Sequence, residues 1–140
     1  MTVNATYVWA WLSAFVSTQA IEVPIYAFAL GRDREGGPGR WPARLGIAFL
    51  LSAVTHPCVW FVIPRVFYAS AWYDELAYAW PALDEHRYAL FFTAAEGFAV
   101  LVEAALLRAF KVERALLWAL VANASSVAFG LMTRFLFDWP

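Results

Sequence analysis

The 140-residue chain contains one cysteine, Cys58, and one lysine, Lys111. A single cysteine excludes an internal disulfide and a cysteine-rich metal site. The only lysine lies in a short polar segment, which excludes a retinal Schiff base inside a membrane span. The formal net charge is −1, with no basic patch or tail, and this argues against nucleic acid as a partner. The opening residues MTVNATY carry no basic side chain, so we expect no cleaved signal peptide.

Apolar residues, in contrast, are abundant. They make up 63% of the chain, and the mean hydropathy is +0.59. Four apolar segments each reach the roughly 20 residues that a helix needs to cross a bilayer. They lie at about residues 7–30, 45–67, 88–110 and 115–137. The sequence therefore predicts an all-α, polytopic membrane protein, with residues 1–140 forming one membrane domain of four transmembrane helices in an up-down bundle.

The basic residues predict the orientation of this bundle. The first and third loops are flanked by Arg32, Arg34, Arg40, Arg44, Arg108, Lys111 and Arg114. The N-terminal segment has no basic residue, and the second loop is rich in acids and aromatics. Because positive loops stay in the cytoplasm, we expect both termini outside. The high alanine, arginine and tryptophan content is typical of bacteria, so the predicted location is a bacterial inner membrane.

Three carboxylic acids and one histidine lie within the predicted spans, namely Glu22, Glu96, Glu103 and His56. An ionisable side chain deep in a bilayer is costly, and such residues normally face a bundle interior or a cavity where they have a function. Glu96 and Glu103 are seven residues apart and share a helix face. The helical rise places all four about 10–21 Å from the cytoplasmic ends of the spans.

Uncharged polar side chains lie at similar depth and spacing. The supporting set is Gln19, Thr55, Asn123 and Ser126. Residues three or four apart in a helix are neighbours, so each span is predicted to carry a polar stripe. Four such stripes are expected to converge on the bundle axis and to form one cluster.

The chemistry of this cluster is left open by the residues alone. The leading hypothesis is a proton- or cation-binding site for transport or ion coupling. The cofactor is unknown. A divalent metal ion held by Glu22, His56, Glu96 and Glu103 is one candidate, although the Glu-x-x-His pairing of carboxylate-bridged dimetal bundles is absent. The structural alternative is a hydrogen-bonded network that only holds the helices together.

Two further alternatives concern partners and catalysis. The chain could be an accessory or scaffold subunit of a larger membrane complex, docked through residues 68–85, with His56 as a pigment or haem ligand. It could also be a small intramembrane enzyme that uses paired glutamates, or a glutamate and histidine, as acid and base on a lipid substrate. That enzyme requires a lateral opening between helices. A bundle of this size also favours a homo-oligomer for transport.

Short motifs in all four spans resemble those of a loose family of small bacterial membrane proteins. They are Ile21-Glu22-Val23-Pro24, Thr55-His56-Pro57, Glu96-x6-Glu103 and Asn123-x-x-Ser126. The resemblance implies a four-helix membrane fold and this list of polar positions, and no activity. At the second motif, the sequences of many members of this family resemble Thr-Asn-Pro, with asparagine at the position of His56. This resemblance implies that His56 is not an obligate ligand.

Overall fold

The computed structural model describes residues 5–32, 39–69, 74–75, 78 and 86–138. The elements in these ranges are helical. They are α1 (Ala5–Arg32), α2 (Trp41–Pro57), the π-helix η1 (Cys58–Val62), α3 (Ile63–Ala69), α6 (Arg87–Ala109) and α7 (Ala115–Phe137). Helices α2, η1 and α3 follow one another without a break and form a single span, Trp41–Tyr68.

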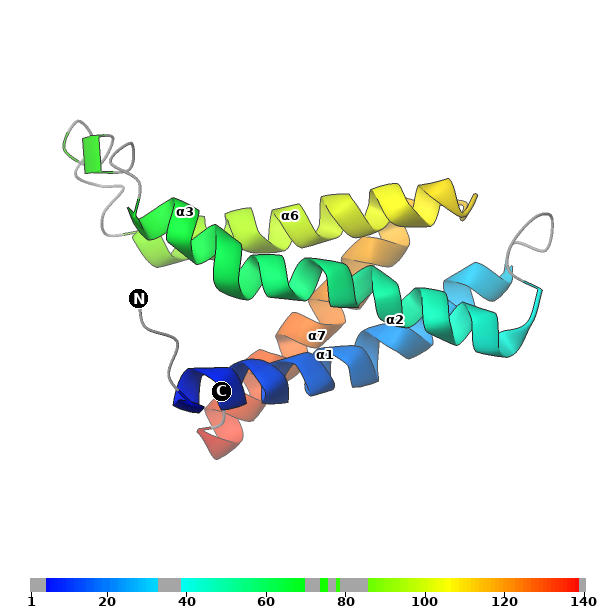
Figure 1. Cartoon of the computed structure of the whole chain (residues 1–140), viewed down its shortest axis with the longest axis horizontal. Helices are drawn as coiled ribbons and strands as arrows, with labels where there is room; N and C mark the ends of the chain where they lie inside the picture. The colour runs from blue at the N-terminus through cyan, green and yellow to red at the C-terminus, as the bar shows by residue number, and fades with distance from the viewer. Residues whose placement is uncertain (1–4, 33–38, 70–73, 76–77, 79–85, 139–140) are drawn as a thin grey trace.

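Four helices are long and apolar enough to cross a membrane, which confirms the predicted four-helix fold. Helix α1 packs on α2 and α7, and α6 packs on α2 and α7, so the four spans close into a bundle. The start of α1 and the end of α7 lie at one end of the bundle, together with the end of α3 and the start of α6 (Figure 1). We call this the terminal end. Most of the predicted docking segment 68–85 lies outside the described residues.

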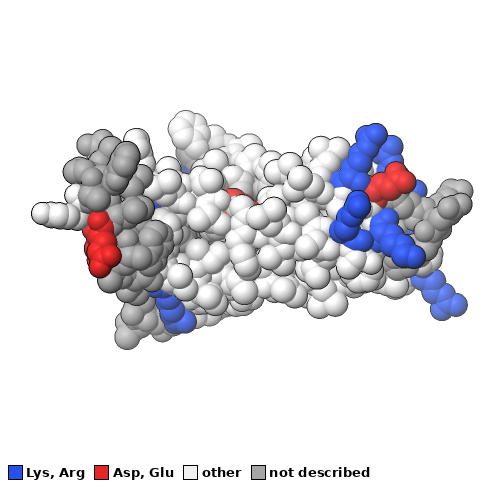
Figure 2. Space-filling view, turned by 90° about the horizontal axis from the view of Figure 1, so that it is seen from above, with Lys and Arg blue, Asp and Glu red and all other residues white. Residues whose placement is uncertain are grey.

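Charge divides the surface into three zones. Basic side chains gather at the end opposite the termini, which we call the basic end (Figure 2). Its described members are Arg32, Arg40, Arg44, Arg108, Lys111 and Arg114. The middle is almost free of charge and exposes large apolar side chains such as Leu50, Leu101 and Leu131. An apolar belt between polar ends is the surface that a bilayer requires. The side of the membrane on which the basic end lies stays a prediction.

The second span is irregular at its prolines. The π-helical segment begins directly after Pro57, where a proline interrupts the regular helical ladder. Pro64 has no N–H to donate to the carbonyl of Trp60, one turn earlier. The hydroxyl of Tyr7 on α1 donates to that carbonyl instead, at 2.7 Å. An interhelical hydrogen bond thus satisfies a polar backbone group that lipid could not.

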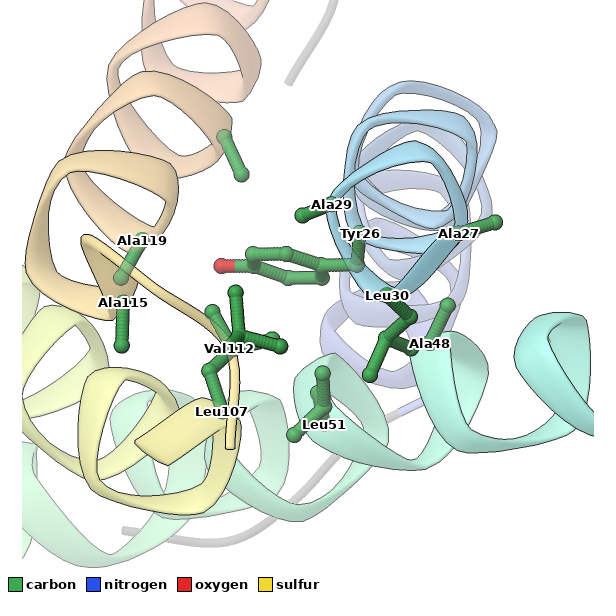
Figure 3. Packing of buried hydrophobic residues seen from close by; sticks show 11 residues of the cluster. Tyr26, Ala27, Ala29, Leu30, Ala48, Leu51, Leu107, Val112, Ala115 and Ala119 are labelled. Atoms are coloured by element: carbon green, nitrogen blue, oxygen red, sulfur yellow. The ribbon is translucent and has the colours of Figure 1, made fainter. Parts of the chain in front are cut away.

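The apolar core occupies the half of the bundle nearer the basic end (Figure 3). Alanines make up much of it, with Ala27, Ala29, Ala48 and Ala119 all 0% exposed. Small side chains allow helix backbones in a membrane to approach closely. Tyr26 extends from α1 through this core toward α7 (Figure 3). The core therefore closes the bundle on one side of the polar residues described next.

Candidate functional site

The predicted polar stripes do meet. A cavity of about 160 Å³ near the middle of the bundle is lined by residues from all four spans. Its lining includes the four predicted ionisable residues, Glu22, His56, Glu96 and Glu103, and three of the supporting set, Thr55, Asn123 and Ser126. We call it the carboxyl cavity. It is large and polar enough to hold water or a small ligand.

Glu103 is the centre of the hydrogen-bond network and is only 1% exposed. Thr55 Oγ1 donates to its Oε1 at 2.6 Å. Asn123 Nδ2 donates to its Oε2 at 2.6 Å, and the hydroxyl of Tyr26 donates to the same oxygen. Four helical elements of the bundle therefore meet at one carboxyl group: α1 through Tyr26, α2 through Thr55, α6 through Glu103 and α7 through Asn123.

The two carboxyl oxygens of Glu22 have different surroundings. Ser126 Oγ donates to its Oε1 at 2.6 Å, whereas Oε2 is buried and makes no hydrogen bond. Ser52 Oγ, also in the lining, is likewise buried and has no partner in normal hydrogen-bond geometry, but it lies close enough to Glu22 to interact with its carboxyl group. Glu22 is 2% exposed and Ser52 is 1% exposed. Buried polar atoms are normally paired, so these two neighbouring atoms mark a place where a small shift of the side chains or a bound ligand would complete the pairing.

The hydroxyls that hold the two glutamates share one geometry. Thr55 Oγ1 lies 2.6 Å from Glu103 Oε1 and 3.0 Å from the carbonyl of Ser52. Ser126 Oγ lies 2.6 Å from Glu22 Oε1 and 3.0 Å from the carbonyl of Asn123. In each case a hydroxyl with one proton faces a carboxyl oxygen and a backbone carbonyl one turn earlier on its own helix. These contacts fix the rotamers of both hydroxyls and thereby the positions of both carboxyl groups.

His56 lies at the aromatic side of the cavity. Its ring centroid is 5.2 Å from that of Phe15, 6.0 Å from that of Trp60 and 6.3 Å from that of Trp11. Its Nδ1 is buried without a hydrogen bond. Within the part of the chain that the structure describes, no three His, Cys, Asp or Glu side chains are grouped so that they could hold a metal ion. The geometry therefore gives no support to the four-ligand metal site that includes His56.

Two predicted positions are peripheral to the network. Glu96 lines the cavity but is only half-buried. Figure 2 shows acidic atoms in the middle of the otherwise uncharged face, so an acidic group is accessible there. Gln19 is buried, and neither polar atom of its amide makes a hydrogen bond. It is not among the residues that line the cavity.

Sequence reasoning missed two important members of the site. Tyr26 connects Glu103 to Asn123, because its hydroxyl donates to the former and accepts from Asn123 Nδ2 at 3.2 Å. Tyr26 lies one helical turn after Glu22, so the spacing could have identified it. Trp60 enters the lining from the π-helix four residues after His56, so the same spacing could have identified it as well.

A second space adjoins the cavity toward the terminal end. Helices α6 and α7 pack together near the basic end and diverge away from it (Figure 1). The space between them, which we call the α6–α7 gap, has a volume of about 300 Å³. Its walls include Tyr88, Phe92, Phe129, Gly130, Leu131 and Arg134, and it shares Ala14, Thr18, Trp60, Ser126 and Val127 with the carboxyl cavity. The two spaces are therefore contiguous.

Comparisons with protein-family models, with curated proteins and with solved structures give no match. The geometry of the cavity and the gap is therefore the evidence for the function of the protein. The resemblance to a loose family of small bacterial membrane proteins stays a prediction.

Proposed function

We propose that the protein binds a proton or a small cation in the carboxyl cavity and uses it for transport or ion coupling across a bacterial inner membrane. The observation that carries this proposal is the composition of the cavity lining. Three glutamates contribute to it, and none of the lining residues is Lys or Arg. Carboxyl groups at this depth, with no Lys or Arg in the lining, require protons or a cationic ligand to offset the cost of burial.

The shape of the bundle supports access from one side. The apolar core lies between the cavity and the basic end, where Leu30, Leu51 and Leu107 are at most 2% exposed. Toward the terminal end, the cavity adjoins the α6–α7 gap, whose own walls extend to Tyr88 and Arg134 near the helix ends. If the basic end is cytoplasmic, as the positive-inside rule favours, the site takes up its ion from outside.

The experiment is a flux assay with purified protein in liposomes. A pH-sensitive dye inside the vesicles reports proton entry when a potassium gradient and valinomycin set the membrane potential. We expect wild-type protein to carry protons and both Glu22→Gln and Glu103→Gln to lose the flux while still inserting as folded protein. Leu101→Ala is the matched control, because that side chain is on α6 and is 66% exposed, away from the cavity.

The same preparations identify the ion. Elemental analysis of wild type beside Glu103→Gln tests for a bound metal, and replacement of protons by sodium or potassium in the flux assay tests for small cations. Unchanged flux in both glutamine variants would refute the proposal. A stoichiometric metal that is present in the wild type and lost in the variant would identify that metal, and not a proton, as the bound ion.

A second candidate is an enzyme that acts on a membrane lipid, and the α6–α7 gap is the observation that favours it. This function requires an opening between helices through which a lipid reaches the acids, and the gap provides one with aromatic walls. Incubation with a polar lipid extract, followed by mass spectrometry, tests it. A product that appears with wild type and not with Glu103→Gln would support an enzyme, and identical lipid profiles would exclude it for those lipids.

A further inference from the structure

The α6–α7 gap and the carboxyl cavity differ in what they offer a ligand. The polar side chains in the gap are largely satisfied by their own helices. Ser17 Oγ donates to the carbonyl of Ser13 at 2.9 Å, and Thr133 Oγ1 donates to the carbonyl of Gly130 at 2.9 Å. What remains for contact is mostly aromatic and aliphatic surface, including Phe92 and Phe129. Such walls suit the apolar body of a ligand.

The cavity at the inner end of the gap presents the opposite surface. Glu22 Oε2 and Ser52 Oγ are buried, lie in the cavity lining and have no partner in normal hydrogen-bond geometry. Glu96 and Glu103 add two more carboxyl groups, and the lining includes His56 but no Lys or Arg. Trp60 lines both spaces, and a tryptophan ring attracts a cation over its face. The group that fits here is therefore positively charged.

From this arrangement we propose that the two spaces together bind a hydrophobic organic cation, whose apolar body occupies the α6–α7 gap and whose charged group lies among Glu22, Glu96 and Glu103. This inference rests on the proposed function, since it names the class of cation that the cavity takes. Charge complementarity selects the cation over a neutral lipid, because a neutral group would leave an ionised carboxyl without a counter-charge. The contiguous apolar gap selects a hydrophobic cation over a hydrated metal ion.

Gly130 provides a direct way to fill the gap. It belongs to the wall of the gap, and a Cβ added there would meet no atom within 4 Å. Gly130→Leu should therefore insert a side chain into open space without a clash. Gly46 on α2 is the matched control, because a Cβ there also meets nothing within 4 Å, and Gly46 lines neither space.

The test is equilibrium dialysis of detergent-purified protein against tetraphenylphosphonium, a permanent hydrophobic cation, with tetraphenylborate as the anion of matched shape. We expect saturable binding of the phosphonium by wild type and Gly46→Leu. Binding should weaken at least tenfold in Gly130→Leu, which fills the gap, and in Glu22→Gln, which removes a counter-charge. The borate should not show saturable binding.

Equal phosphonium affinity in wild type and Gly130→Leu would overturn the proposal. So would borate binding as tight as phosphonium binding, which would indicate an anionic lipid held near Arg134 instead. The two proposals can also fail separately. Glu103-dependent proton flux without phosphonium binding would overturn this inference alone. Phosphonium binding that depends on Glu22 in a protein without flux would leave this inference standing and refute transport of protons.

Discussion

Truncation of Glu103 should destabilise the bundle by an amount that its contacts set. Its carboxyl group accepts hydrogen bonds from Tyr26, Thr55 and Asn123, which lie on the three other spans. Hydrogen bonds between helices in membranes average about 0.6 kcal/mol and reach about 1.7 kcal/mol. Three of them predict a loss of about 2 kcal/mol in the free energy of unfolding for Glu103→Ala. The buried donors of Tyr26, Thr55 and Asn123 would lose their acceptor in this variant, and this makes the expected loss of stability larger.

Glu103→Gln should behave differently. The new amide oxygen can accept from Tyr26 and Asn123, and the new amide N–H can donate to Thr55 Oγ1. Thr55 then remains able to donate to the carbonyl of Ser52, which lies 3.0 Å away. Because all contacts are kept, we expect this variant to lie within about 1 kcal/mol of wild type, the range of shape-conserving replacements.

The assay is unfolding in mixed micelles with increasing sodium dodecyl sulfate, followed by circular dichroism. Leu101→Ala on the same helix is the control, and its lipid-facing side chain should change stability by less than about 0.5 kcal/mol. The reasoning is refuted if Glu103→Ala is as stable as this control, because the network would then hold no helices together. If the glutamine variant is as unstable as the alanine variant, the proposed re-pairing of the amide is wrong.

Three further predictions concern other parts of the bundle. Tyr7→Phe removes the donor to the carbonyl of Trp60 and should cost about 1 kcal/mol in the same unfolding assay; no change would mean that another group satisfies this carbonyl. Ala27→Leu adds volume at a fully buried position and should cost about 1–3 kcal/mol; a tolerated leucine would contradict close packing there. The third prediction concerns orientation and uses spheroplasts that express the protein with Cys58 replaced by serine. A membrane-impermeant maleimide should label Asp138→Cys in intact spheroplasts and Arg40→Cys only after lysis. The reverse pattern would overturn the predicted orientation.

The number and the approximate positions of the four spans could be predicted from the hydrophobicity and the spacing of apolar segments in the sequence. The four predicted segments correspond to Ala5–Arg32, Trp41–Tyr68, Arg87–Ala109 and Ala115–Phe137. A bilayer sets the length of a span and requires backbone hydrogen bonds within it, so composition alone is informative there. The depth of Glu22 and Glu103 also follows from the sequence, because the rise per residue of a helix is fixed.

The pairing of these residues, in contrast, depends on how the helices pack and does not follow from the sequence pattern. Helical spacing assigned Gln19 and Glu22 to the same stripe, yet Glu22 lines the cavity and Gln19 does not. The position of a stripe relative to neighbouring helices depends on their crossing angles, which small core residues such as Ala27 set through long-range packing. The role of Tyr26 depends on the same packing, because its hydroxyl reaches Glu103 across 77 residues of sequence.

The α6–α7 gap is likewise a property of the assembled bundle. Nothing in the pattern of either segment distinguishes the end where the two helices pack together from the end where they diverge. The angle between them follows from the contacts that α6 makes with α2 and that α7 makes with α1. Hydrophobicity and the helical rise thus predict four spans and the depth of their acids, whereas the packing of each helix against its neighbours sets which acids meet and where the cavity opens.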